Sequence, residues 1–193
     1  IVAQYTSGDT SVIVFYEQPE AVQVVASETQ NKEAIVEKEL RELLALDEKA
    51  DVLAAVKDLK AKGLRVDGIG MQGHWGMDYP ARDEAEAAII AYASTGANVM
   101  ITEMELTVLP IVGNSQGADI AQNFELKKEL NPYPDGLPED MQQKLTNRYA
   151  EIFALFHKHA DKISRVTMWG VQDGNSWRNN WPVRGRTDYP LLF

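Results

Sequence analysis

The sequence predicts an α/β fold built on a parallel sheet, because apolar strand-like runs alternate with amphipathic helices along most of its 193 residues. Polar and aromatic residues also gather directly after these runs, where parallel α/β folds place their functional sites. With 45% hydrophobic residues, the chain is long enough to bury one core. A doubly wound sheet and half of a β/α barrel account for this order equally well.

The N-terminal part predicts one strand followed by two helices. A β-branched and aromatic run at 12–16 is typical of a short buried strand. Apolar residues then recur at helical spacing among Glu and Lys, first within 31–44 and again within 52–59. Gly63 stands where it would end the second helix.

The rest of the chain continues the alternation of strands and helices. A loop rich in Gly, Pro and Asn, at about 110–138, interrupts it. The expected elements are strands at 66–71, 98–102 and 166–169 and helices at 83–93 and 140–159.

Composition excludes several classes of partner and cofactor. The 29 acidic and 19 basic residues give a net charge of -10, which would repel nucleic acid. No apolar run has the length of a membrane span, and the absence of cysteine removes disulfides and thiolate metal sites. His157 and His159 are two residues apart on a helix and point to different faces, so we expect no metal site. We also expect no cofactor.

The first cluster of candidate functional residues follows the expected strand 66–71. Residues 72–75 read Gln-Gly-His-Trp, so His74 stands beside the large ring of Trp75, and histidine is the residue type whose charge can change near neutral pH. Taken alone, a histidine of this kind is more often structural than functional.

The second cluster ends the expected strand 98–102. Glu103 follows the apolar run, and Glu105 lies on the same face if the strand continues. Without other information, Glu103 is as often a solvated loop acid as a functional carboxylate.

The third cluster is the polar loop 169–177, which carries an indole at each end. Trp169 and Trp177 are costly to expose without a use, and sugar rings stack their C–H faces on aromatic planes. The alternative is that one or both indoles pack the loop onto the sheet. A carboxylate, a histidine and indole platforms together indicate a carbohydrate site.

Four further segments are informative: DGIGMQGHW at 67–75, NVMITEMEL at 98–106, VTMWGVQDGNSWR at 166–178 and YPLLF at 189–193. Together they strongly resemble the family 10 glycoside hydrolases, principally endo-β-1,4-xylanases. The similarity covers 59–193, and its segments occur in the family order, with the spacing of strands six to eight. The resemblance implies the C-terminal half of a (β/α)8 TIM barrel, with strands five or six to eight. A whole barrel typically takes about 250 residues, more than the 193 of this sequence.

The resemblance implies roles for the second cluster. Glu103 matches the nucleophile of retaining cleavage, and His74 matches the histidine that hydrogen-bonds it. In the family, an Asp two positions after the nucleophile holds that histidine. Glu105 stands there in this chain, and its longer side chain either preserves the contact or displaces the imidazole.

The resemblance also implies a sugar-binding surface. Gln72 matches a polar residue near the acid/base, and Trp169 and Trp177 match the indoles around the sugar under attack. Looser candidates for substrate contact are Trp75, Asn175 and Arg178.

A second carboxyl group is needed for retaining hydrolysis, about 5 to 5.5 Å from the nucleophile. The family carries this acid/base in a WDVVNE-like segment that the chain does not contain. Glu17, after the first strand, is a weak candidate and more often a loop acid. Residues 1–58 do not resemble the family, so we expect the chain to be a fragment, the product of a rearranged gene or an engineered chimera. We expect residues 1–58 to pack with residues 59–193 as one domain.

We therefore expect a retaining endo-β-1,4-xylanase, or a fragment of one, that acts on xylan or xylo-oligosaccharides. By the resemblance it would be secreted, periplasmic or at the cell surface. The alternative is a non-catalytic or engineered half-barrel scaffold or carbohydrate-binding module that lacks the acid/base. The open edges of half a barrel favour a homodimer or pairing with a complementary N-terminal half-barrel chain.

Overall fold

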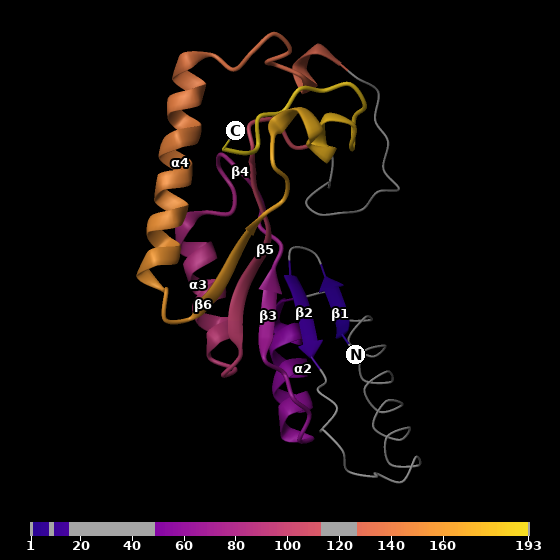
Figure 1. Ribbon diagram of the computed structural model, residues 1–193, viewed down its shortest axis with the longest axis vertical. Coiled ribbons are helices and arrows are strands. Elements are labelled where there is room, and N and C mark those ends of the chain that lie inside the picture. The colour runs from indigo at the N-terminus through magenta and orange to yellow at the C-terminus, as the bar shows by residue number, and fades with distance from the viewer. Residues whose placement is uncertain (1, 8–9, 16–48, 113–126, 193) are drawn as a thin grey trace.

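The protein is described here by a computed structural model that covers residues 2–7, 10–15, 49–112 and 127–192. Within these residues, three α-helices pack on one face of a six-stranded sheet (Figure 1). The helices are α2 (Lys49–Ala61), α3 (Arg82–Ala93) and α4 (Glu139–Lys158). The strands are β1 (Val2–Ser7), β2 (Thr10–Phe15), β3 (Gly68–Met71), β4 (His74–Gly76), β5 (Asn98–Thr107) and β6 (Ile163–Met168).

Strand β5 is the centre of the parallel part of the sheet. β3 pairs with its first half and β4 with its last three residues, while β6 pairs with it in parallel as well. Between β3 and β4, the amide of Glu103 donates to the carbonyl of Gln72 at 2.7 Å and that of Glu105 to Gly73 at 3.0 Å. β3 and β4 therefore form one interrupted line along β5.

The sheet is not parallel throughout, which corrects the arrangement expected from the strand pattern. The strand expected at 12–16 exists as β2, but it forms an antiparallel hairpin with β1 and pairs antiparallel with β3. The hairpin thus occupies the edge of β3 at which a further parallel strand was expected.

The other expected elements agree with the structure except at their ends. β5 continues to Thr107, five residues beyond the expected end at 102, and β6 begins at Ile163. β4 was not expected, and the helix expected within 31–44 lies outside the described residues. Gly63 follows α2 with a φ of 77°, the left-handed conformation typical of a residue that ends a helix.

The core lies between the sheet and the helices. Ile69, Val99 and Ile101 are fully buried in one cluster with Val56 of α2 and Ile152 of α4. No helix among the described residues is long and apolar enough to cross a membrane. Strand β6 is the least covered strand of the parallel part of the sheet, since each of its residues is half-buried or exposed and none is buried.

Candidate active site

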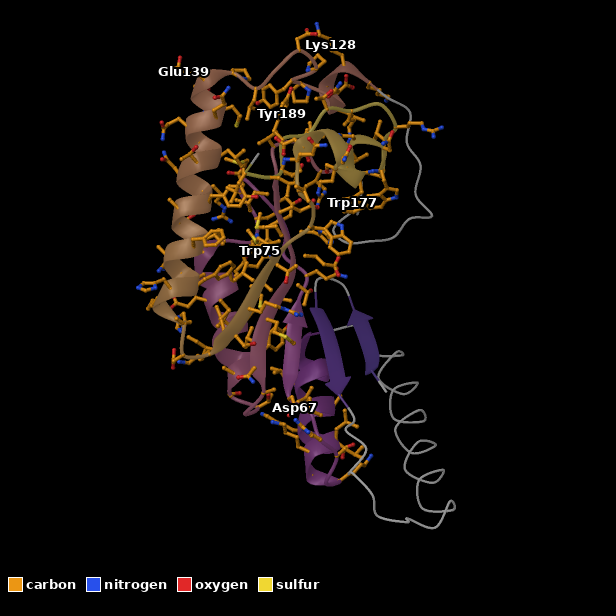
Figure 2. The ribbon with its side chains drawn as sticks, viewed as in Figure 1. Asp67, Trp75, Lys128, Glu139, Trp177 and Tyr189 are labelled. Atoms are coloured by element: carbon orange, nitrogen blue, oxygen red, sulfur yellow. The ribbon has the colours of Figure 1, made fainter. Side chains whose placement is uncertain are left out.

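The candidate residues meet at one end of the parallel strands. The loop that follows β6 carries Trp177 at this end, whereas Asp67, just before β3, lies at the other (Figure 2). Strand β5 is irregular here, because Ile101 pairs with Val166 and Met104 with Met168, which leaves one extra residue on β5. Bulges of this kind re-aim side chains and are frequent beside active sites.

The two carboxylates of β5 are joined by one histidine. His74 Nε2 lies 2.9 Å from Oε2 of Glu103, and His74 Nδ1 lies 2.8 Å from Oε1 of Glu105. His74 and Glu105 are register partners on β4 and β5, so the backbone pairing aligns them. The longer side chain of Glu105 therefore preserves the contact with the imidazole, which the sequence had left open.

Glu105 is fully buried and receives three hydrogen bonds on a single oxygen. Trp177 Nε1 donates to Oε1 at 2.9 Å and Arg178 Nε at 2.6 Å, in addition to His74. Oε2 is buried without a hydrogen-bond partner among the described residues. Burial acts to raise the pKa of Glu105, but the hydrogen bond from His74 and the charge of Arg178 outweigh it and hold the pKa below its usual value.

The hydrogen bonds constrain the protons of His74. An ionised carboxylate only accepts hydrogen bonds, so two ionised partners require a proton on each ring nitrogen. With Glu103 and Glu105 ionised, His74 is then an imidazolium between two negative charges, and Arg178 supplies the second positive charge. In that protonation state the charges of the four groups sum to zero.

Aromatic rings surround the histidine. Its ring centroid lies 5.9 Å from that of Trp169 and 5.2 Å from that of Trp177. Trp177 in turn stacks on Trp181, with centroids 4.8 Å apart and planes 17° apart. Trp169 is 45% exposed, which leaves ring surface free for a ligand beside the side chain of Glu103, itself only 14% exposed.

Two of the looser candidates for substrate contact are buried. Trp75 is 2% exposed and packs against Phe156 of α4, so its ring belongs to the core. Arg178 is 7% exposed and is turned inward to Glu105. These placements argue against the direct substrate contacts suggested by the sequence.

The remaining candidates stand at the strand ends in different surroundings. Gln72 is 4% exposed, and its Oε1 has no hydrogen-bond partner among the described residues. Asn175 is exposed on a one-turn helix in the loop after β6. Glu17 lies outside the described residues. Within the described ranges, no group of His, Asp or Glu is arranged to hold a metal ion.

Asp188 is a buried carboxylate at the end of β5 that no sequence motif indicated. Asp188 accepts a hydrogen bond from Thr107 Oγ1 at 2.5 Å and others from the amides of Val108 and Tyr189. Burial raises its pKa, although these hydrogen bonds and Arg178 oppose the rise. The contacts tie the closing segment of the chain to the end of β5. Asp188 stands alone in a polar stretch, so spacing gave no sign of its burial.

Comparisons with known proteins place this geometry in a family context. A model described as glycosyl hydrolase family 10 matches residues 42–193. Endo-1,4-beta-xylanase A of Xylanibacter ruminicola is 45% identical over 142 residues, which are 74% of this chain and 38% of the relative. The family match begins before the boundary at 59 expected from the sequence, and it therefore includes α2.

Solved structures agree with part of the same fold. A GH10 endoxylanase from a sugarcane soil metagenome has 45% identity and a TM-score of 0.71, over 74% of this chain and 41% of that one. A mutant structure in complex with xylotriose has 30% identity and a TM-score of 0.59, over 77% of this chain and 41% of that one. The chain thus matches part of a TIM barrel with an α/β fold, and spans about 40% of the length of such relatives.

Proposed function

The chain belongs to glycosyl hydrolase family 10, and from that premise we propose that it carries the nucleophile half of a retaining endo-β-1,4-xylanase. The observation that carries the proposal is the chain of hydrogen bonds from Glu105 through His74 to Glu103. It holds Glu103 next to the same histidine ring that the partly exposed Trp169 approaches, and the exposed part of this indole supports access for a sugar.

In the proposed reaction, Glu103 attacks the anomeric carbon of a xylosyl unit. The bond between that carbon and the glycosidic oxygen breaks, which leaves a covalent glycosyl-enzyme ester. Because His74 occupies Oε2 of Glu103, the attacking atom is Oε1. Water then cleaves the ester, restoring the carboxylate and releasing the sugar.

The proposed substrate is xylan or a xylo-oligosaccharide. A relative is named as an endo-1,4-beta-xylanase, and another was solved with xylotriose. We propose that Trp169 and Trp177 flank the sugar ring, that Gln72 contacts its hydroxyls, and that Asn175 contributes from the loop. The unpaired Oε1 of Gln72 supports a role in accepting such a hydroxyl.

The leaving oxygen needs a proton, and the network around Glu103 does not provide one. Glu105 is the other carboxylate of this network, and it is buried and held by three donors. We propose that the acid/base comes from a complementary N-terminal half-barrel, either on a separate chain or in a longer form of this one. A homodimer is a second way to cover the open edges of the sheet. We also propose that the protein is secreted, periplasmic or at the cell surface.

We also propose that residues 1–58 and 59–193 form one domain. Backbone pairing of β2 with β3 crosses the boundary and supports this.

A carbohydrate-binding module without catalysis is the alternative function. The partly exposed ring of Trp169 supports it, because stacking on a sugar requires no acid/base.

A mechanism-based fluoroxyloside with an activated aryl leaving group separates the two functions. Such a leaving group departs without a proton donor, so we expect a covalent adduct on Glu103, detected by mass spectrometry of the intact protein and its peptides. Glu103→Gln should abolish the adduct, and the exposed Glu129→Gln serves as the matched control. A folded wild-type chain that forms no adduct but binds xylotriose would indicate the binding module.

A further inference from the structure

The side chain of Arg178 is directed away from the sugar site and toward Glu105. Its Nε donates to Oε1 of Glu105 at 2.6 Å, and the guanidinium carbon lies 5.0 Å from the centre of the Trp177 ring. The backbone is held on both sides, because its amide donates to Ser176 Oγ and its carbonyl accepts from Arg186. A side chain fixed in this way keeps one geometry with little entropic cost at the moment of reaction.

We propose that Arg178 is a positioning residue, which keeps Glu105 ionised and oriented so that His74 presents an N–H to Glu103. This inference rests on the proposed function of Glu103. It assigns Arg178 to the interior of the catalytic network and not to substrate recognition.

The surroundings of Glu105 explain why a cation is needed there. A carboxylate that is 0% exposed would favour its neutral form if nothing compensated for the loss of water. A neutral Glu105 carries its own O–H, which can donate to His74 Nδ1. The histidine would then no longer require protons on both ring nitrogens. The charge of Arg178 opposes this neutralisation, and burial of both partners limits screening by salt.

The state of the histidine then determines the state of Glu103. While Glu105 is an anion, His74 donates through Nδ1 and its second proton lies on Nε2, directed at Oε2 of Glu103. That hydrogen bond holds the carboxylate with Oε1 free for attack. Without Arg178, we expect a mixture of protonation states and a less well oriented nucleophile.

Trp177 cannot replace Arg178 in this role. Its indole N–H donates to the same oxygen at 2.9 Å but carries no charge. A lysine at 178 would keep the charge but lose the fixed planar geometry of the guanidinium group. The conservative variant Arg178→Lys therefore separates charge from shape.

The test compares Arg178→Met, Arg178→Lys and the exposed Arg184→Met, a control in the same loop. The first measurement is nitrogen NMR of the His74 ring, with the signals of the three histidines distinguished by a His74→Asn variant. We expect both ring nitrogens of wild type and Arg184→Met to be protonated near neutral pH. Arg178→Met should lose the proton of one ring nitrogen, and Arg178→Lys should retain both.

The second measurement is the rate at which the activated fluoroxyloside labels Glu103, followed against pH. In this step Glu103 oxygen bonds to the anomeric carbon and the aryl group leaves as its phenolate. Arg178→Met should be labelled about 10- to 100-fold more slowly, with the acidic limb of the profile moved to higher pH, and Arg178→Lys should recover most of the rate.

Two results would overturn the inference. One is a folded Arg178→Met protein with the wild-type histidine spectrum and pH profile. The other, which holds even if Arg178→Met does not fold, is an Arg178→Lys protein that folds but loses the second ring proton. Absence of labelling in wild type would instead refute the proposed function of Glu103, and the histidine spectra would still decide the role of Arg178.

Discussion

His74 and Glu105 face each other across the β4–β5 ladder, and their side chains are joined by an Nδ1 to Oε1 hydrogen bond of 2.8 Å. The backbone register therefore fixes the histidine before any substrate binds. Glu105 lies at the centre of the network, since His74, Trp177 and Arg178 all donate to one of its oxygens.

Removal of Glu105 should destabilise the fold strongly. In Glu105→Ala, Arg178 and His74 would remain buried without their shared acceptor, and breaking a buried ion pair in this way costs about 3 to 5 kcal/mol. Denaturant unfolding measures the change. Glu105→Asp keeps the charge on a shorter side chain. If it lowered the free energy of unfolding as much as Glu105→Ala does, the charge would contribute little to stability.

The stability of the protein should fall in acid partly through Glu105. Its pKa in the folded state lies below the ordinary value of 4.5, so its contribution is complete above that value and is lost as pH falls through the folded pKa. Glu105→Gln should remove this part of the pH dependence. The difference in unfolding free energy between wild type and Glu105→Gln should therefore shrink below about pH 4.5. A constant difference across that range would mean that the pKa is not depressed.

Much of the fold could be predicted because the apolar runs are strong. The run at 98–102 is continuously apolar, the helix at 83–93 has a strong helix-forming composition, and the helix at 140–159 has a clear apolar face, so all three were recognised. β4 was missed because it has only three residues and follows the break at Gly73. The antiparallel direction of β2 was missed because a strand pattern does not contain the direction of its partner.

The site was predictable only where side chains lie at strand ends. The resemblance implied a contact of His74 with Glu103 and left the contact with Glu105 open, and the structure has both hydrogen bonds. Arg178 was only a looser candidate for substrate contact, which the resemblance implied. Its partner Glu105 is 73 residues away in the sequence, a pairing that local patterns do not reveal. Trp75 was likewise a looser candidate for substrate contact, and local patterns do not reveal that it packs against Phe156 in the core.

Gly73 should tolerate no side chain, because it has a φ of 86° and a Cβ atom would lie 2.8 Å from Cγ2 of Ile101. Gly73→Ala should lower the free energy of unfolding by about 1 to 3 kcal/mol and displace His74 from the carboxylates. Gly174→Ala is the matched control, since nothing lies within 4 Å of its Cβ position. Equal thermal stability of the two variants would contradict the tight packing of β4 on β5.

Substitution of Trp169 should affect sugar binding, whereas substitution of Trp75 should affect stability. Trp169 is 45% exposed, so Trp169→Ala should weaken the binding of xylotriose about 3- to 10-fold, as expected for the loss of one stacking contact, with little change in stability. Trp75 is 2% exposed, so Trp75→Ala should cost about 3 to 5 kcal/mol of stability. Calorimetric titration with xylotriose and denaturant unfolding of each variant measure the two effects. If Trp169→Ala unfolded as readily as Trp75→Ala and bound xylotriose normally, its ring would be packing and not a platform, and the sugar site would have to lie elsewhere.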